Sequence, residues 1–250
     1  MDTSKLTTAR WEILNGRELT APSRDALLEL VSDRLGFAPP GMAIEEMRPV
    51  APLPAADCPT VIALCLGHAR KGDQGAWSVG GVPEELWHVR TELLDRVQAE
   101  LGSRGVRSFI VEEYEGRDYA SAMRWLAGHL RDRGATAAVE FHFNAATPTA
   151  RGHEVLYHET SRFGVRLAEL VNKRFSEYLP GPNRGAKPLA ARDRGGLFVS
   201  MTHCPAAILE PFFGSNAADW KFFSTSQAGL VESTVRGLVD FAEFYRGAKN

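Results

Sequence analysis

Hydrophobic positions along the chain follow two alternating patterns, short continuous runs and longer stretches with helical spacing. Residues 61–66 form a continuous apolar run of strand length, which is typical of a strand covered on both faces. A stretch from about Pro83 to Leu101 keeps a helical period in its apolar positions. Further strands are expected at 108–111, 137–143, 155–157, 196–201 and 206–209, and further helices at 120–130, 165–175 and 228–245.

The alternation of strands and helices predicts an α/β fold, with a mostly parallel twisted sheet of about six strands and helices on both faces. A cluster of prolines precedes the first strand, because six fall between residues 39 and 59, a density that excludes continuous helix or central strand. We therefore expect residues 1–56 to form a small N-terminal appendage and Pro-rich linker, and residues 57–250 to form the main domain. The segment 183–187 is expected to be a solvated loop.

Composition narrows the class of protein. The 250 residues are 44% hydrophobic and 24% charged, which is close to globular averages and excludes wholesale disorder. Lys and Arg number 29 and Asp and Glu 31, so the net charge of −2 predicts no nucleic-acid partner. The three cysteines, which lack CxxC spacing, exclude a disulfide framework. Nothing in the composition indicates an oligomeric state.

The N-terminal residues contain no apolar core of signal-peptide length, and no apolar run reaches about 18 residues. These observations predict a soluble chain that is made in the cytoplasm and is not inserted into the membrane. A substrate outside the membrane would then require release of the protein by another agent.

Polar side chains follow three of the predicted strands, at the point where each strand ends. His68 follows the first of these strands, His142 lies at the end of the third, and Glu210 directly follows the run 206–209. Ligands gather at the carboxyl ends of strands in such sheets. Two imidazoles and a carboxylate suggest a divalent metal with an acid/base partner, since catalytic zinc sites use these ligands and leave one position open. Singly, each histidine is more often a turn or core-edge residue.

A third ligand is expected at the start of the amphipathic stretch, where Glu84 and Glu85 compete. Glu85 continues the apolar stripe of Leu93 and Val97, which is predicted to face inward. Glu84 aligns instead with His88, on a face that we expect to be solvated. The spacing favours Glu85, although a carboxylate in the first turn of a helix also complements the helix dipole.

Glu210 and two asparagines complete the set of candidate residues. The segment Pro-Phe-Phe follows Glu210, and a carboxylate in apolar surroundings has a raised pKa, which suits a group that takes and gives a proton. The alternative is a buried carboxylate paired with an arginine. Asn144 and Asn216 are candidates for orienting a substrate, and their alternative role is turn formation.

Four segments together resemble the zinc-dependent N-acetylmuramoyl-L-alanine amidases of amidase family 3, found among bacterial wall hydrolases and phage endolysins. The family's GHGGxDxGA-like loop corresponds to GHARKGDQGA, and its ligand glutamate at a helix start corresponds to GGVPEE. Its S-x-H-x-N-A motif corresponds to EFHFNA, and its LxE-x-G-F-x-x-N motif to LEPFFGSN. The resemblance spans about residues 60–246. Ala69 and Arg70 replace glycines of the first motif, and Glu140 replaces the serine of the third.

The resemblance implies that residues 57–250 are a catalytic domain in which His68, Glu85 and His142 hold Zn²⁺ and Glu210 is the catalytic acid/base. The bond cut would join the lactyl carbonyl of N-acetylmuramic acid to L-alanine in peptidoglycan, whose glycan strand and stem peptide would be the partner. The missing export signal favours a phage-type endolysin that acts on the wall after release. The alternatives are a zinc carboxypeptidase or other amidohydrolase, and a non-catalytic wall-binding module.

Overall fold

The computed structural model describes residues 60–248, which form six strands and seven helices. The strands are β1 (Val61–Leu66), β2 (Arg107–Val111), β3 (Ala137–Phe141), β4 (His153–His158), β5 (Asn183–Leu189) and β6 (Ala206–Glu210). The helices are α3 (Glu84–Arg90), α4 (Leu93–Ser103), α5 (Tyr119–Asp132), α6 (Arg162–Tyr178), α7 (Gly196–Met201), α8 (Ala217–Phe223) and α9 (Ala228–Gly247). None of these helices is both long and apolar enough to cross a membrane. The predicted appendage, residues 1–56, lies outside the described residues.

The strands form one sheet in the order β2-β1-β3-β6-β4-β5. The pairs within β2-β1-β3-β6 are parallel, β4 and β5 are parallel to each other, and β4 pairs with β6 in the antiparallel direction. The predicted fold class, a mostly parallel six-stranded sheet with helices on both faces, is confirmed. Because β4 is reversed, its first residues lie beside the last residues of β6.

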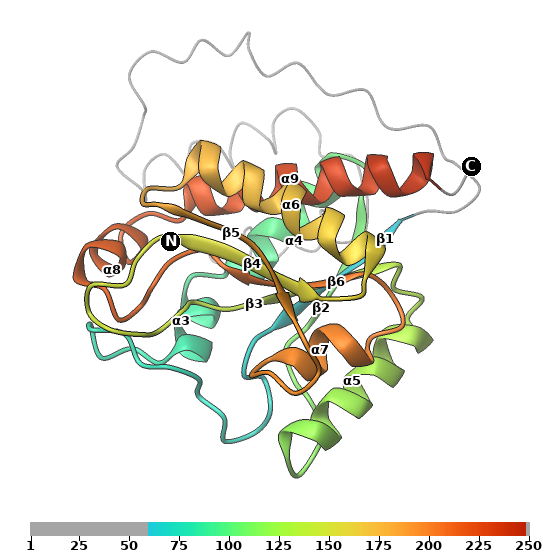
Figure 1. Ribbon diagram of the computed structural model, residues 1–250, viewed down its shortest axis with the longest axis horizontal. Helices are drawn as coiled ribbons and strands as arrows, with labels where there is room; N and C mark the ends of the chain where they lie inside the picture. The colour runs from blue at the N-terminus through green and yellow to red at the C-terminus, as the bar shows by residue number, and fades with distance from the viewer. Residues whose placement is uncertain (1–59, 249–250) are drawn as a thin grey trace, which may run out of the picture. The chain divides into compact units, whose positions relative to one another are not determined.

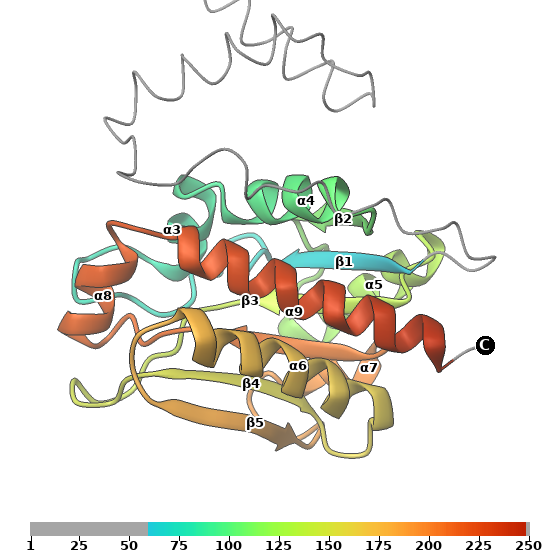
Figure 2. The same cartoon turned by 90° about the horizontal axis from the view of Figure 1, so that it is seen from above.

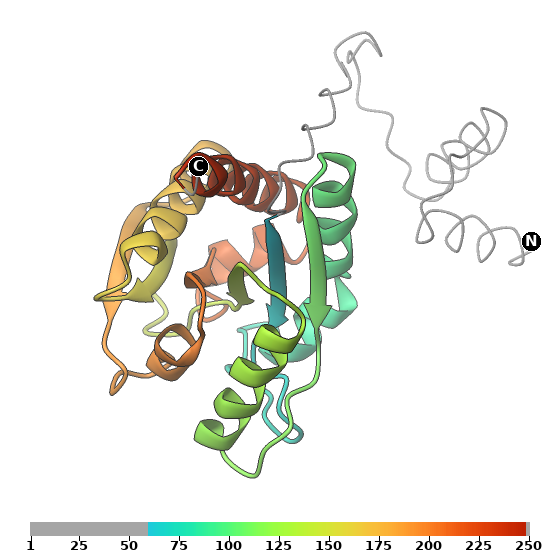
Figure 3. The same ribbon diagram turned by 90° about the vertical axis from the view of Figure 1, so that its right-hand side faces the viewer.

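Helices cover the sheet on two sides (Figure 1). Helices α4, α6 and α9 form one layer, in which α9 packs against both α4 and α6, and α5 and α7 lie on the opposite side (Figure 3). Helices α3 and α8 lie beyond the end of the sheet toward which β1 runs (Figure 2). The central strands β1 and β3 are almost fully buried, as their continuous apolar runs predict.

Two segments differ from the sequence prediction. Residues 196–201 form α7 rather than a strand, since a six-residue apolar run has the same composition in a buried helix as in a buried strand. Residues 183–189 form the edge strand β5 rather than a solvated loop. The loop prediction was wrong because Gly185 and Pro188, although they are turn-forming residues, are tolerated in an edge strand.

The amphipathic stretch after Pro83 is two helices and not one. Helix α3 ends at Arg90, and α4 begins at Leu93. Between them, Glu92 has a left-handed backbone with φ of 49°, and the Thr91 hydroxyl donates to the carbonyl oxygen of Trp87 at 2.9 Å. The break turns the chain, so the inward-facing positions of α4 do not continue the inward-facing positions of α3.

Candidate metal centre and active-site pocket

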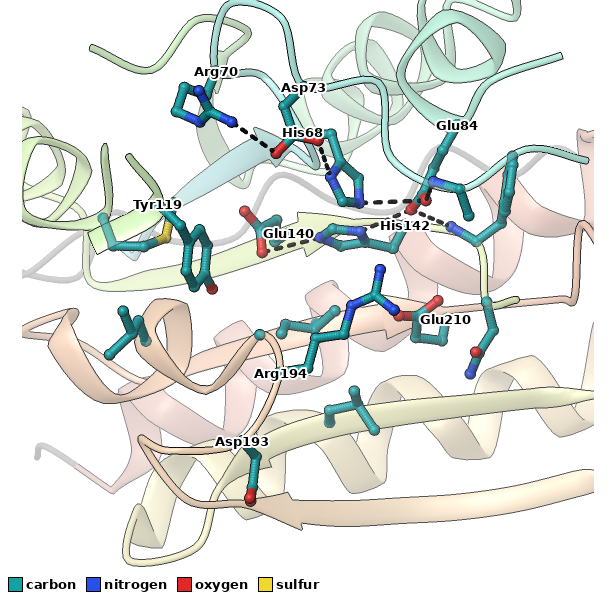
Figure 4. Close-up of a pocket in the computed structure, with 18 of the residues that line it drawn as sticks. His68, Arg70, Asp73, Glu84, Tyr119, Glu140, His142, Asp193, Arg194 and Glu210 are labelled. Carbon is teal, nitrogen blue, oxygen red and sulfur yellow. Dashed lines mark hydrogen bonds and ion pairs between the residues drawn. The ribbon is translucent and has the colours of Figure 1, made fainter. Parts of the chain in front are cut away.

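A pocket of about 870 Å³ lies at the carboxyl end of the central strands, and residues of α5 and α7 also line it. Strand residues on its floor come from β3, β4 and β6, and its walls come from the loop after β1, from α5 and from the segment before α7. The lining residues that carry charge are His68, Arg70, Asp73, Glu84, Glu140, His142, Glu154, Arg192, Asp193, Arg194 and Glu210. Figure 4 shows most of them converging on one space.

His68 lies in the glycine-rich loop after β1, with a left-handed backbone of φ 60°. Its Nδ1 is 3.0 Å from Oδ1 of Asp73, which also accepts from the backbone N–H of Gly75. This contact directs the other ring nitrogen, Nε2, toward Oε2 of Glu84 at 3.3 Å. The loop therefore orients the imidazole toward the interior of the site.

His142 follows β3 and faces His68, with ring centroids 4.9 Å apart. Its Nδ1 is 2.8 Å from Oε1 of Glu84, and its Nε2 is 3.0 Å from Oε2 of Glu140. Burial opposes a charge on the imidazole, but the carboxylates of Glu140 and Glu84 outweigh burial and raise the pKa of His142. The two imidazoles thus meet on either side of one carboxylate.

Glu84 is that shared carboxylate, and its side chain is 2% exposed. The backbone N–H groups of Ala76 and Phe143 donate to Oε2 and Oε1 at 3.1 and 3.0 Å. Burial acts to raise the pKa of Glu84, but the charge of His142 and the hydrogen bonds to both imidazoles outweigh it and lower the pKa. A carboxylate held ionised in this way suits a cation.

The structure places Glu84 between the histidines, and the choice of Glu85 was therefore wrong in its geometry. Helix α3 buries Glu84, Trp87 and His88, whereas Val89 is 50% exposed. The inward-facing stripe of α4 does not extend back into α3, because the backbone break at Glu92 changes the phase between the two helices. Pro83 starts the helix so that the first carboxylate, not the second, points inward.

Two glycines allow the side chains to approach this closely. A Cβ on Gly75 would lie 2.5 Å from Cδ2 of His68 and 2.8 Å from Oε2 of Glu84. A Cβ on Gly67 would lie 2.6 Å from Cε1 of His142. Gly75 also has a positive φ of 68°, which residues with a side chain rarely adopt. Both positions therefore require glycine for this arrangement.

The donor set fits a zinc ion. One ligand atom from each of His68, Glu84 and His142 lies within 4.8 Å of the others, and no other group of three such residues occurs in the described part of the chain. Ligand atoms at about 2.0–2.1 Å from a tetrahedral zinc lie roughly 3.3 Å from one another. The measured 3.3 and 2.8 Å from Glu84 to the two imidazoles are close to that spacing. Two histidines and one glutamate leave a fourth position open.

Glu210 ends β6 and lines the same pocket, where Figure 4 shows it below His142. Its Oε2 is buried and has no hydrogen-bond partner among the described residues. Burial raises the pKa of Glu210 to about 8, against the lowering effect of His142, and the charges of Glu84, Glu154 and Glu140 add to the rise. The apolar sequence around Glu210 predicts this raised pKa, and the catalytic role of Glu210 stays a prediction.

Glu154 is a pocket residue that the sequence analysis missed. It lies opposite Glu210 in the register of β4 and β6. Lys187 and Arg184 contact its Oε2 at 2.5 and 2.6 Å, and the side-chain amide of Asn144 donates to its Oε1 at 2.7 Å. The sequence shows a carboxylate next to the apolar residue Val155. It was missed because Glu154 lies at the start of a strand, whereas the search was for polar residues at strand ends.

The two asparagines have different environments. Asn144 lines the pocket, and its role in substrate binding stays a prediction. Asn216 is not a lining residue, because its side chain caps α8 by accepting from Ala218 and Asp219 and donates to the carbonyl of Pro148. The position of Asn216 therefore favours a structural role over contact with a substrate.

Comparison with known families gives one match that covers most of the chain. The family model described as N-acetylmuramoyl-L-alanine amidase matches residues 62–240. No curated protein matches the sequence significantly.

Solved structures similar to this chain share its fold. The N-acetylmuramoyl-L-alanine amidase AmiC2 of Nostoc punctiforme aligns with a TM-score of 0.61 at 23% identity, covering 74% of this chain and 97% of that one. The CwlD amidase from Clostridioides difficile, solved in complex with the GerS lipoprotein, aligns with a TM-score of 0.64 at 16% identity, covering 74% and 99%. The catalytic domain of the CD27L endolysin, which targets Clostridia difficile, aligns with a TM-score of 0.59 at 21% identity, covering 72% and 97%.

Proposed function

The chain belongs to the N-acetylmuramoyl-L-alanine amidase family, hydrolases that act on peptidoglycan, and from this premise we propose that it is a zinc-dependent member. Its substrate would be the amide that joins N-acetylmuramic acid to L-alanine of the stem peptide. The observation that carries the proposal is the convergence of His68, Glu84 and His142, with an unpaired Glu210 in the same pocket.

The three metal-facing residues would hold Zn²⁺ through Nε2 of His68, a carboxylate oxygen of Glu84 and a ring nitrogen of His142. A zinc ion there supplies Lewis-acid polarisation of the amide carbonyl and lowers the pKa of water that attacks it. Asp73 keeps His68 turned toward the site, and the backbone amides of residues 76 and 143 keep Glu84 in place.

Glu210 would carry the proton. Its carboxylate accepts a proton from the attacking water as the new carbon–oxygen bond forms. It then donates that proton to the nitrogen of L-alanine as the carbon–nitrogen bond breaks, so the amine leaves neutral. A pKa raised from the usual carboxyl value suits both steps, because a group with a pKa close to the working pH both accepts and donates.

The direct test is digestion of purified cell walls, followed by mass spectrometry of the products. We expect free stem peptides with an intact L-alanine amino terminus, and no further release after exhaustive removal of metal with a chelator. Cleavage within the peptide would identify a carboxypeptidase instead. Undiminished release from metal-free protein would overturn the zinc assignment.

A pair of neighbouring variants tests the ligand set. Glu84→Ala removes the carboxylate that contacts both imidazoles, so bound zinc and stem-peptide release should both be lost. Glu85→Ala, its matched control on the same helical turn, should retain both. Zinc content by metal analysis and the rate of wall digestion are the measurements. Loss of zinc in Glu85→Ala with retention in Glu84→Ala would contradict the assignment.

We also propose that the enzyme acts as an endolysin, made in the cytoplasm and released onto the wall. The structural similarity to an endolysin catalytic domain supports this role. Cells that express the protein should lyse only after the cytoplasmic membrane is permeabilised. Lysis of intact expressing cells would indicate an exported wall enzyme instead.

A further inference from the structure

Glu140 is an acidic residue inside a strand whose other residues are apolar. All five residues of β3 are buried, and Glu140 is 3% exposed. A carboxylate in such a position is costly unless it is paired and hydrogen-bonded. The corresponding position of the motif that this chain resembles carries serine, so the usual pattern does not require a charge here. A specific partner must compensate for its burial.

Two side chains supply that compensation. The hydroxyl of Tyr114 donates to Oε1 of Glu140 at 3.2 Å, and Nε2 of His142 lies 3.0 Å from Oε2. Nε2 is buried and makes no hydrogen bond to any described residue, so this oxygen at ion-pair distance is the polar atom that it faces. The backbone N–H of Tyr114 in turn donates to the carbonyl of Ala69, next to His68.

The site is therefore built from two similar pairs around Glu84. His68 presents Nε2 to Glu84 and Nδ1 to Asp73, and His142 presents Nδ1 to Glu84 and Nε2 to Glu140. Figure 4 shows the five side chains in this succession. The side chain of Asp73 is 30% exposed, whereas the side chain of Glu140 is 5% exposed. Glu140 is not among the residues whose ligand atoms lie within 4.8 Å of one another, so it stands outside the metal-facing group.

We propose that Glu140 is a positioning residue, which holds Nε2 of His142 and leaves Nδ1 to the metal, and that Tyr114 fixes Glu140 in turn. The proposal rests on the zinc site proposed above. A carboxylate on the outer nitrogen sets the tautomer and orientation of a metal-binding imidazole and makes the inner nitrogen a stronger donor, an effect of roughly 10–100-fold in metal affinity.

Zinc affinity of the metal-free protein, titrated against a competing chelator, tests this role. Glu140→Ala should bind zinc about 10–100-fold more weakly. Glu140→Gln, whose amide oxygen still accepts from Nε2–H, should recover most of that loss. A Gln variant as weak as the Ala variant would overturn the positioning role, because it would indicate that the carboxylate itself binds the ion. Glu112→Ala, an exposed charge deletion nearby, should leave affinity unchanged.

Tyr114→Phe should weaken zinc binding less than Glu140→Ala does, and it should cause no further loss when Glu140 is already alanine. This coupling is expected because the tyrosine acts through the carboxylate. Equal losses from Tyr114→Phe in both backgrounds would contradict an action through Glu140. Thermal unfolding of each variant reports whether it is folded, and the Gln and Phe variants keep the test available if Glu140→Ala does not fold.

The ring nitrogen is identified directly by ¹⁵N resonances of the histidines in the zinc-loaded protein. We expect a proton on Nε2 of His142 and the metal on Nδ1, with the Nε2–H signal lost or shifted in Glu140→Ala. Zinc on Nε2 would overturn the proposal even in a fully active amidase. Conversely, the expected resonances in a protein that binds zinc but releases no stem peptide would refute the proposed activity and leave the role of Glu140 standing.

Discussion

Glu210 and Glu154 lie opposite each other on the adjacent strands β6 and β4 and line the same pocket, yet their hydrogen-bonding surroundings differ. Glu210 has a buried, unpartnered Oε2, and burial raises its pKa to about 8. Glu154 is buried too, but Lys187 and Arg184 hold it, and its pKa is lowered because these two bases outweigh the effect of burial.

The difference shows that the neighbouring charged and polar groups, and not the residue type or the strand position, determine the pKa of each carboxylate in this pocket. A carboxyl group with an elevated pKa carries protons, whereas one that stays ionised acts as a fixed charge. Glu154 also acts on its neighbour, since its negative charge is one cause of the raised pKa of Glu210. In the proposed mechanism the pair is a proton carrier beside a fixed charge that raises the pKa of that carrier.

The largest expected effect comes from removing the proton carrier. Glu210→Gln keeps the shape of the side chain but cannot accept a proton, so kcat for stem-peptide release should fall by roughly 10²–10⁴-fold. Zinc content should stay at the wild-type value, since Glu210 is not a ligand. A rate within threefold of wild type would show that the two carboxylates do not differ in the way proposed.

The pH dependence of stability should distinguish the two carboxylates in metal-free protein. The folded pKa of Glu210 is raised from 4.5 to about 8, so the folded state binds more protons in that window and stability falls as pH rises through it. The slope for one proton is at most about 1.4 kcal/mol per pH unit. Glu210→Gln should flatten this fall in urea unfolding experiments.

The contribution of Glu154 to stability depends on pH in the opposite sense. Its folded pKa lies below 4.5, so its contribution is present above that pH and is lost as pH falls through the folded pKa. Glu154→Gln should therefore reduce stability near neutral pH and match wild type in strong acid. The same dependence on pH in both variants would remove the contrast.

A smaller effect is expected on catalysis when the fixed charge is neutralised. Glu154→Gln removes a negative neighbour of Glu210, which lowers the pKa of Glu210 and moves the optimum of the pH–rate profile to lower pH. The amide still accepts from Asn144, so kcat should fall by less than about tenfold, or 1.4 kcal/mol. A shift of the optimum to higher pH would contradict the coupling.

The smallest effects should come from the bases that hold Glu154. The side chains of Arg184 and Lys187 are 36% and 40% exposed. Each contact with Glu154 therefore contributes less than about 1 kcal/mol to the free energy of unfolding. Arg184 also lies over the ring of Phe213 at 4.8 Å, a contact worth roughly 0.5–1 kcal/mol at an exposed site. Arg184→Ala should therefore cost more unfolding free energy than Lys187→Ala.

Sequence reasoning found the residues that follow parallel strands. His68, His142 and Glu210 each come at the end of an apolar run, and the topology of parallel strands brings such ends to one edge. It did not find Glu154, because the reversal of β4 depends on pairing with β6, a segment about fifty residues away that leaves no local pattern.

The sequence also failed to predict the phase of α3 and the partners of Glu140. The phase of α3 was taken from Leu93 and Val97, across a break that depends on the left-handed backbone of Glu92, a conformation that its residue type does not predict. Glu140 is a charged residue in an otherwise apolar run. The sequence does not show its partners, because Tyr114 and His142 contact it only in the folded chain.

The reversed direction of β4 also determines where the chain tolerates change. The connection from β3 leaves and re-enters the sheet at the same end, so residues 142–152 stay at that end, and four of them line the pocket. It closes at Gly152, whose N–H donates to Asp219 and whose φ of 99° admits no side chain easily. Residues added or deleted between His142 and Gly152 would reshape the rim of the pocket and leave the register of the sheet intact. Natural or engineered variation in loop length here would therefore change which wall chemotypes the pocket accepts.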